Sequence, residues 1–569
     1  MKFYLLLFLI NIVIINDVAA QDANRNDVII DEIFADPTPQ IGLPAAEFVE
    51  LKNVATIPFN LAGWKLSDGT STATLPNFIL LPDSFVIICA TSAAVSFVPF
   101  GRALGVSNFP SLNNDADIIS LRSPQNKIIH AVSYSDNWYQ NVLKKEGGWT
   151  LEMTDTKNPC SGFTNWKASA DPKGGTPGKI NSSDAINADK QAPKLLRAFA
   201  TDSLNIRLVF EEPLDSLTAA TLANYTISDG GVIQAAVCRP PVFDEVDIKL
   251  KTILQSDKIY SITVNGVTDC AGNIIGSKKS VRVGLSTLPD SFDIVINEIL
   301  FNPRPDGVDY VELYNRSQKI TDASQLYVAN RSTTGVISSI MQLTEIPLLL
   351  FPADYLVITT EPAIVKQQYI SLNPEAFIRA LTMPSFPDDK GDVIILNAQG
   401  KNIDEVKYND KWHFKLISNT EGVALERVDY NGSSAENNFH SAATSVGYGT
   451  PGYKNSQYRM DEKIQGEIKL TPEIFSPDND GVDDFLTIDY SFPTPGYVAN
   501  ITVFDALGRP VRYLQRNALS GIKGNYRWDG LGENFQKLSQ GIYIIYTEIF
   551  NTDGKKKQFK NTVVLARHS

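Results

Sequence analysis

Histidine, methionine and cysteine are all scarce in this chain of 569 residues, which contains four, five and four of them. Four scattered histidines leave little material for a hydrolytic metal centre. Basic residues are also outnumbered, because 51 lysines and arginines face 64 aspartates and glutamates, a formal charge of −13. Since affinity for nucleic acids comes largely from cationic contacts to phosphates, we expect no nucleic-acid partner.

The motifs of common hydrolases and nucleotide-binding proteins are absent as well. The sequence has no Gly-x-Ser-x-Gly elbow, no His-Glu-x-x-His helix, no P-loop and no Gly-x-Gly-x-x-Gly run that opens a helix, as a dinucleotide fingerprint does. After residue 20, no apolar run reaches the about 18 residues of a membrane-spanning helix, so we expect no transmembrane segment. No helical period of useful length appears either. These absences argue against an enzyme and against a helical protein.

The sequence opens with the pattern of a leader. Lys2 precedes an apolar run over residues 3–15, and the small residues Val18 and Ala20 stand before Gln21. This arrangement predicts a secretory signal peptide cleaved after Ala20, with a buried N-terminal helix as the alternative. We therefore expect an exported protein that is extracellular or on the outer cell surface.

One module of about 150 residues occurs twice in the chain. The matching segments are 28–37 (VIIDEIFADP) with 294–303 (IVINEILFNP), 47–53 (EFVELKN) with 309–315 (DYVELYN), 134–138 (YSDNW) with 408–412 (YNDKW), and 175–178 with 449–452 (both GTPG). Such self-similarity predicts two copies of one structural unit with another segment between them.

Each copy consists of short runs rich in β-branched and aromatic residues, such as 48–51, 85–88 and 117–121. Glycine, proline, asparagine and aspartate separate these runs. Strands of this length at this spacing are typical of antiparallel sandwiches rather than of alternating strands and helices. The sequence therefore predicts an all-β fold class.

The motifs at 28–53 and at 60–68 (NLAGWKLSD) make the repeat resemble the lamin-tail domain. That family has an immunoglobulin-like β-sandwich, which occurs in nuclear lamins and in secreted bacterial proteins. The closing segment, NWKAS at 165–169 and GGTPG at 174–178, is similar to the version found in Bacteroidetes surface proteins. The resemblance implies tandem immunoglobulin-like β-sandwich domains.

The second copy departs from the lamin-tail pattern at two tryptophans. Trp64 aligns with Leu326, and Trp166 aligns with Phe439. Packing tolerates such exchanges, whereas a binding site that depends on tryptophan does not. We therefore expect no site centred on the Trp64 position in the second copy.

Two other segments resemble further modules of bacterial surface proteins. Residues 210–215 (FEEPLD) and 266–273 (GVTDCAGN) are similar to a bacterial immunoglobulin-like spacer domain. Residues 475–484 (FSPDNDGVDD) and 526–530 (YRWDG) resemble the FlgD-like C-terminal sandwiches that accompany type IX secretion in Bacteroidetes. This second resemblance implies the secretion machinery as a partner.

Together these patterns predict five segments. They are a signal peptide (1–20), a first lamin-tail domain (21–183, module one), an immunoglobulin-like domain (184–289, the spacer), a second lamin-tail domain (290–458, module two) and a FlgD-like domain (459–569, the C-terminal sandwich).

The four cysteines permit three pairings. Cys89 and Cys160 lie in module one, and module two has Thr359 and, within one residue, Ser433 at the equivalent places. Because both thiols are missing from module two together, we predict that they are bonded to each other. The predicted disulfides are Cys89–Cys160 and, by elimination, Cys238–Cys270. A four-cysteine zinc site and free buried thiols are the alternatives.

The sharpest ligand-like motif lies in the C-terminal sandwich. Asp478, Asp480 and Asp484 surround Gly481, whose missing side chain allows a tight turn. Carboxylates that converge in this way can bind Ca²⁺, the one cofactor that the sequence suggests. The motif is partial, because Asp489 stands where an EF-hand places its glutamate. An acidic turn before a strand is the alternative interpretation.

Two pairs of glutamates recur in the two modules, Glu32 with Glu298 and Glu50 with Glu312. Paired carboxylates can serve general acid–base catalysis. However, no histidine or nucleophile lies near them in the sequence, and each glutamate belongs to a strand-like run. We interpret them as exposed or edge-facing carboxylates without chemistry, and we predict no catalytic residues.

The leading hypothesis is a non-enzymatic structural or adhesive protein that binds or bridges polymers of the cell surface or the extracellular space. The expected partners are polysaccharide, protein or cell-envelope material. Two weak sites joined by a spacer gain affinity through effective concentration. The alternative is an accessory subunit of an extracellular nuclease, phosphoesterase or glycosidase, because lamin-tail modules resemble parts found beside such enzymes.

Overall fold

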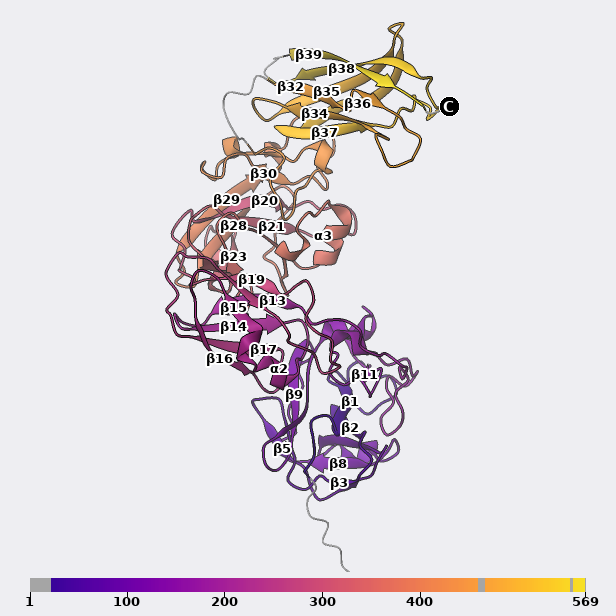
Figure 1. Cartoon of the computed structure of the whole chain (residues 1–569), viewed down its shortest axis with the longest axis vertical. Helices are drawn as coiled ribbons and strands as arrows, with labels where there is room; N and C mark the ends of the chain where they lie inside the picture. Colours follow the sequence, from indigo (N-terminus) through magenta and orange to yellow (C-terminus); the bar gives the residue numbers. More distant parts are fainter. Residues whose placement is uncertain (1–21, 459–465, 553–555, 568–569) are drawn as a thin grey trace, which may run out of the picture. The chain divides into compact units, whose positions relative to one another are not determined.

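The computed structural model describes residues 22–458, 466–552 and 556–567, so the predicted signal peptide lies outside the described residues. The chain forms two compact units, Met1–Leu254 with Ile259–Val283, and Gln255–Lys258 with Gly284–Ser569 (Figure 1). The first unit contains module one and nearly all of the spacer, and the second contains module two and the C-terminal sandwich. The boundaries between the four domains stay a prediction.

Strands dominate both units, which confirms the predicted all-β class. Side chains alternate between buried and more exposed along β14 (Asn205–Phe210) and β18 (Tyr260–Val264), as expected for strands with one face on a core. The α-helices of the described residues are α1 (Ala94–Phe97), α2 (Ser216–Ala219) and α3 (Pro362–Gln368). In this part of the chain, no helix combines the length and the apolar character needed to cross a membrane.

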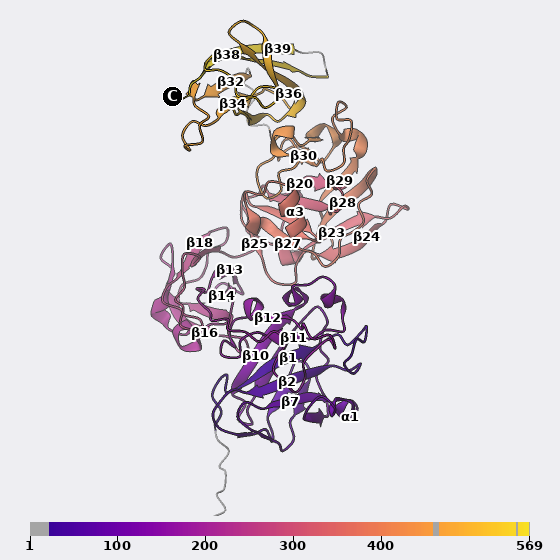
Figure 2. The same ribbon diagram turned by 90° about the vertical axis from the view of Figure 1, so that its right-hand side faces the viewer.

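Module one is a sandwich of a six-stranded sheet, most of which is labelled in the lower part of Figure 2, and a four-stranded sheet, and it also has a separate two-stranded sheet. The first has the order β12 (Trp166–Ala168), β11 (Leu151–Met153), β1 (Val28–Phe34), β2 (Phe48–Asn53), β7 (Phe85–Ala90), β8 (Ala103–Val106); the second β10 (Ile128–Ser135), β9 (Ala116–Arg122), β4 (Lys65–Ser67), β5 (Thr72–Thr74); the third β3 (Phe59–Asn60), β6 (Ile79–Leu80). The core between the sheets includes Trp64 and Trp166.

Module two repeats this topology strand for strand. Its sheets are β27 (Phe377–Arg379), β26 (Tyr355–Thr359), β21 (Tyr310–Asn315), β20 (Ile294–Leu300), β30 (Leu425–Arg427), β31 (Phe439–Ser441); β24 (Ile337–Gln342), β23 (Leu326–Arg331), β28 (Lys390–Asn397), β29 (Asn402–Asn409); and β22 (Thr321–Asp322), β25 (Leu349–Leu350). Leu326 and Phe439 are buried in its core, as Trp64 and Trp166 are in module one. The exchanged positions therefore keep their packing role.

The spacer is a smaller sandwich of two antiparallel sheets. Its strands are β13 (Leu195–Ala200), β14, β17 (Glu245–Leu250), β16 (Ile233–Cys238) in one sheet and β15 (Tyr225–Ile227), β18, β19 (Ser280–Val283) in the other. The chain turns after β15 at Asp229 and Gly230, both with positive φ, as the Asp-Gly-Gly sequence there predicts.

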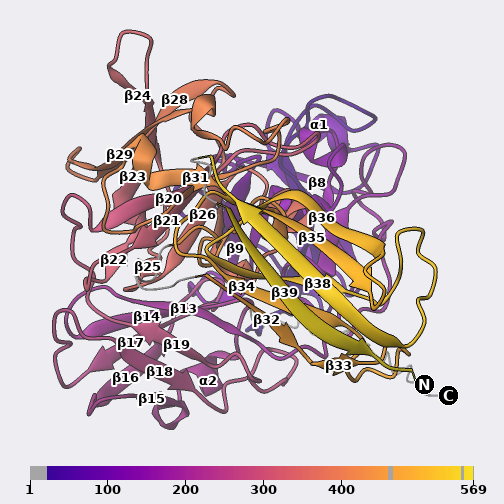
Figure 3. The same cartoon turned by 90° about the horizontal axis from the view of Figure 1, so that it is seen from above.

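The C-terminal sandwich pairs a three-stranded sheet with a five-stranded sheet. Its strands are β32 (Glu467–Thr471), β34 (Leu486–Ser491), β37 (Lys523–Trp528) in one sheet and β33 (Ile474–Phe475), β39 (Lys556–Leu565), β38 (Gly541–Phe550), β35 (Tyr497–Asp505), β36 (Pro510–Ser520) in the other. Figure 3 shows β39, β38, β35 and β36 side by side. Trp528 and Phe475 pack in the core between the sheets.

Candidate functional site

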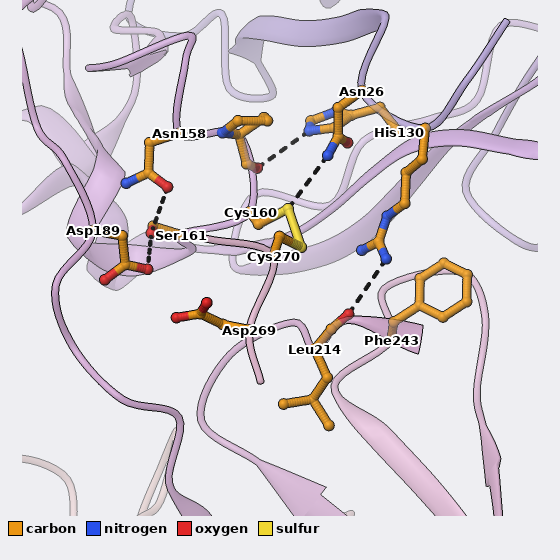
Figure 4. Close-up of a disulfide and its surroundings, with 12 residues drawn as sticks. Asn26, His130, Asn158, Cys160, Ser161, Asp189, Leu214, Phe243, Asp269 and Cys270 are labelled. Atoms are coloured by element: carbon orange, nitrogen blue, oxygen red, sulfur yellow. Dashed lines mark hydrogen bonds between the residues drawn. A yellow bond between two sulfur atoms is a disulfide. The ribbon is translucent and has the colours of Figure 1, made fainter. Parts of the chain in front are cut away.

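The disulfide of this chain joins Cys160 of module one to Cys270 of the spacer, with 5.9 Å between their Cα atoms (Figure 4). Cys89 and Cys238 are buried free thiols. Both predicted pairings, Cys89–Cys160 and Cys238–Cys270, are therefore wrong. Burial raises the pKa of the Cys89 thiol to about 11, which keeps it protonated and unreactive.

The error has a physical reason, because the two cysteines of module one have unrelated roles. Cys89 lies on β7 opposite Phe48, in an apolar cluster that includes Phe97. At its place in module two, Thr359 instead donates a hydrogen bond to the Asp309 carbonyl oxygen. Cys160 serves the contact between module one and the spacer. The two thiols are thus missing from module two for separate causes.

Removal of this disulfide should loosen the contact between module one and the spacer. We expect the double substitution Cys160→Ser with Cys270→Ser to lower the free energy of unfolding of the first unit by about 2–4 kcal/mol. Denaturant unfolding of the full chain measures this loss. Non-reducing peptide mapping provides the independent check, and recovery of a Cys89–Cys160 peptide would contradict the assignment.

Polar contacts surround the disulfide on both sides of the junction (Figure 4). Asn26 donates a hydrogen bond to Cys160 Sγ over 3.4 Å, and Ser161 donates one to Asp189 Oδ2 over 2.7 Å. The Arg25 guanidinium donates to the Leu214 carbonyl oxygen over 3.3 Å and lies 4.3 Å from the centre of the Phe243 ring. The contacts of Ser161 and Arg25 attach module one to the spacer besides the covalent bond, whereas that of Asn26 stays within module one.

Three carboxylates meet next to this junction, those of Asp189, Glu212 and Asp269. Each offers one oxygen, and these oxygens all lie within 4.8 Å of one another, which is a spacing that a cation such as Ca²⁺ can bridge. Burial, followed by the charges of Asp189 and Asp269, raises the pKa of Glu212 to about 8. Sequence reasoning missed this group, because its members are spread over 81 positions and share no motif.

In the C-terminal sandwich, the structure brings together the carboxylates of Asp478, Asp480 and Asp484 within the same 4.8 Å limit. Asp484 also accepts hydrogen bonds from the backbone N–H groups of Asn479 and Gly481, over 2.6 Å and 2.9 Å. The loop therefore has both the carboxylates of a cation site and the internal hydrogen bonds of an acidic turn. Calcium binding here stays a prediction.

Calcium should stabilise the C-terminal sandwich if this loop binds it. When the Ca²⁺ concentration is a hundred times the dissociation constant, the free energy of unfolding should rise by about 2.7 kcal/mol. Asp480→Asn should abolish this increase. Asparagine keeps the acceptor for the Val482 N–H group and removes only the charge. The measurement is calorimetric titration with Ca²⁺ together with the melting temperature. Absence of heat and of any thermal shift would exclude the site.

The recurring glutamates form a buried row across three strands in each module. In module one, Glu32 of β1 stands opposite Glu152 of β11 on one side and Glu50 of β2 on the other. Glu298, Glu426 and Glu312 form the same row in module two. All six side chains are fully buried, so the interpretation as exposed or edge-facing carboxylates is wrong.

The reason is that the GTPG loop of each module covers the row. In module one, Thr176 donates its N–H to Glu32 and its hydroxyl to Glu152, each over 2.7 Å, and Gly178 N–H donates to Glu50. The loop needs glycine at Gly178, since its φ is +81° and a Cβ would lie 2.3 Å from the Phe100 carbonyl oxygen.

The same contacts recur in module two. Thr450 donates its N–H to Glu298 over 2.9 Å and its hydroxyl to Glu426 over 2.9 Å, and Gly452 N–H donates to Glu312. Strand alternation alone could not reveal this cover. The recurrence of Glu152 and of the GTPG motif was the available signal.

The two rows differ in how completely their oxygens are hydrogen-bonded. In module two, Asn297 donates to Glu312 Oε1 over 2.6 Å and Tyr310 donates to Glu298 Oε1 over 2.5 Å. Module one has Asp31 and Phe48 at these places, so both donors are missing. As a result, both oxygens of Asp31 and one oxygen each of Glu32 and Glu50 are buried without a hydrogen-bond partner.

Burial raises the pKa values of these acids in module one. The pKa of Asp31 rises to about 7, that of Glu32 to about 8, and that of Glu50 well above its usual range, with the neighbouring carboxylates adding to the effect. A proton that these carboxyl groups retain or share can donate the hydrogen bond that Asn297 and Tyr310 donate in module two. No substrate can reach either row, because its members are fully buried.

A second buried pair distinguishes the modules. Asp404 and Arg427 of module two form a fully buried ion pair at 2.8 Å, and Asp404 also accepts the Ile296 N–H over 2.8 Å. In module one, His130 Nδ1 accepts the corresponding Ile30 N–H over 3.0 Å. Met153 stands at the place of Arg427. The backbone N–H group at this strand position thus donates to a histidine ring in module one and to a carboxylate in module two.

Module two carries an open groove of about 940 Å³. It crosses the ends of β23, β28 and β29, which lie side by side in Figure 2. Its lining includes Lys390, Lys407, Lys411 and Trp412. The corresponding face of module one carries Trp138 and lines a cavity of about 230 Å³ that spacer residues close.

Comparison with known families agrees with two of the resemblances. A family model described as Lamin Tail Domain matches residues 21–136, and one described as CHU_C Type IX secretion signal domain matches residues 469–565. The second match indicates export and attachment at the cell surface, which confirms the predicted localisation. Among proteins with curated descriptions, no match is found.

Solved structures resemble the chain only distantly. The S-layer protein SbsC is 13% identical, with 66% of this chain and 54% of SbsC covered and a TM-score of 0.16. Latent PorU from Porphyromonas gingivalis is 11% identical, with 79% and 40% covered and a TM-score of 0.15. The chain thus spans about half the length of SbsC, and similarity at this level carries no argument about function.

Proposed function

Because the chain carries a lamin-tail domain and a type IX secretion signal domain, and is exported to the cell surface, we propose that it is a non-enzymatic structural or adhesive protein that binds or bridges extracellular polymers. Its partners outside the cell are polysaccharide, protein or other envelope material. On the way there, the secretion machinery is its partner.

The observation that carries this proposal is the open groove on module two. Its volume of about 940 Å³ lies at the upper end of the range for ligand sites, about 300–1,000 Å³. It is lined by polar and charged side chains around one partly exposed tryptophan, Trp412. Such a surface suits a hydrated polymer better than a small apolar ligand.

The buried carboxylate rows support a role without catalysis. A general acid or base must come within about 2.6–3.2 Å of the proton that it transfers. Glu32 and Glu298 are fully buried beneath the GTPG loops, and each accepts a hydrogen bond from the threonine N–H group of its loop. The recurring glutamates thus hold the loops in place, and their recurrence is explained by folding alone.

The experiment is co-sedimentation of the purified full chain with insoluble cell-envelope polymers. We expect the chain to sediment with them. In parallel, nitrophenyl-phosphate, nitrophenyl-glycoside and nucleic-acid substrates should remain intact. A chain that stays in the supernatant at low ionic strength, or that cleaves one of these substrates, would contradict the proposal.

A further inference from the structure

The groove on module two carries a concentration of positive charge that the overall charge of the chain does not suggest. Lys390, Lys407 and Lys411 all line it, and all three side chains are exposed. Among the described residues, the ammonium groups of Lys390 and Lys411 have no ion pair. Lys407 lies 3.8 Å from Glu405, which Arg331 already engages with two hydrogen bonds of 2.8 Å.

Module one serves as an internal comparison, because the two modules share one topology. The register is fixed by a common contact, since Tyr134 donates its hydroxyl to the Asn113 carbonyl oxygen and Tyr408 donates to the Pro387 carbonyl oxygen. In this register the three lysines correspond to uncharged residues. They are Ala116, Ser133 and Asn137, at the places of Lys390, Lys407 and Lys411. The positive charge is therefore a property of module two and not of the fold.

The two faces also differ in what meets them. In module one, Trp138 faces a cavity that the spacer residues Glu212 and Pro213 help to close. In module two, Trp412 packs against Phe439, with ring centres 5.9 Å apart, and keeps part of its surface in the open groove. An aromatic ring in this setting offers a flat apolar surface beside cationic groups.

We propose that the groove of module two binds an acidic polysaccharide, a polymer of sugar rings that carry carboxylate groups. One sugar ring lies on Trp412, and carboxylates of neighbouring sugars pair with Lys390 and Lys411. This inference rests on the proposed function and names the class of polymer. It also assigns the binding to one module, so the second lamin-tail copy is the adhesive one.

The acidic residues of the groove favour a polysaccharide over a phosphate polymer. Asp392 and Glu436 line it together with the lysines. Carboxylates accept hydrogen bonds from sugar hydroxyl groups, whereas they repel a dense row of phosphates. A nucleic acid or a polyphosphate chain therefore fits this lining less well.

Three polymers test the proposal on the full chain. Polygalacturonate has sugar rings and carboxylates, dextran has the rings alone, and inorganic polyphosphate has the charge alone. Isothermal titration should show binding of polygalacturonate that weakens between 50 and 500 mM NaCl, with dextran and polyphosphate binding at least tenfold more weakly. Equal or tighter binding of polyphosphate would overturn the assignment in favour of a simple charge site.

Variants then locate the site. The double substitution Lys390→Ala with Lys411→Ala should weaken polygalacturonate binding at least tenfold and leave the melting temperature unchanged, since both side chains are exposed. Asn137→Ala, at the matched place in module one, should leave binding unchanged. If the double variant binds as the parent chain does, the groove is excluded as the binding site, while polymer binding by the chain, which the proposed function requires, is still demonstrated. If the parent chain binds neither polygalacturonate nor envelope polymers, both fail.

Discussion

Replacing Arg427 with methionine should cost module two about 3–5 kcal/mol of its free energy of unfolding. The substitution leaves the Asp404 carboxylate fully buried without its partner, and it removes the hydrogen bonds from Arg427 to the Ile296 carbonyl oxygen and the Ser434 hydroxyl. Denaturant unfolding of the full chain measures the loss. Hydrogen exchange at β20 and β30 assigns it to this module.

Module one supplies the matched control for this prediction. It has His130 and Met153 where module two has Asp404 and Arg427, and it is fully packed there. The double variant Asp404→His with Arg427→Met should therefore recover much of the stability that Arg427→Met loses. We expect the ion pair to tolerate joint replacement of both residues but not the loss of Arg427 alone. If Arg427→Met is as stable as the parent chain, this expectation is wrong.

Replacing Asp31 with asparagine should stabilise module one by about 1–3 kcal/mol at pH 8. Asparagine at the equivalent place in module two, Asn297, donates to Glu312 Oε1 over 2.6 Å. The new amide can donate in the same way to Glu50 Oε1, which is now buried without a partner. Asn297→Asp is the mirror experiment, and it should destabilise module two by a similar amount.

The gain from Asp31→Asn should depend on pH, and the sign follows from the pKa values. Folded module one retains protons on Asp31 up to about pH 7 and on Glu32 up to about pH 8, whereas the unfolded chain releases them near pH 4. The folded state thus binds more protons between pH 4 and 8, so its stability falls as pH rises through this window.

His130 opposes this trend at the acid end. Burial lowers its pKa to about 4, so stability is lost as pH falls below about 6.5, the ordinary pKa of histidine. The decline with rising pH is therefore steepest between about pH 6.5 and 7, where both acids still hold their protons in the folded state and His130 no longer opposes the trend. The advantage of Asp31→Asn should be small at pH 4 and full by pH 8. Hydrogen exchange at β1, compared between parent and variant at each pH, measures it, and a gain that is the same at both pH values would contradict the account.

The features that could be read from the sequence are local or repeated. Short runs such as 85–88 and 117–121 become β7 and β9, because hydrophobic periodicity and turn residues act over a few positions. Asp478, Asp480 and Asp484 come together because seven consecutive residues contain all three. The type IX secretion domain was recognisable for the same reason, since its motifs are contiguous.

Features that depend on how separate segments meet could not be read in this way. The Cys160–Cys270 bond requires the position of the spacer against module one, and no spacing in the sequence encodes it. The burial of Glu32 depends on a loop that is 144 residues away. A strand pattern places such a side chain on a face and does not say what covers that face.

Light scattering on the purified full chain mixed with an acidic polysaccharide tests the central claim, since the same recording separates bridging from cleavage. Our account predicts that the average molar mass rises on mixing, while polymer recovered after dissociation at high salt keeps its original length. Shortened polymer after recovery would show that the chain breaks bonds and would contradict the account. An average molar mass of the mixture that is no higher than expected for protein and polymer that do not associate would contradict it as well.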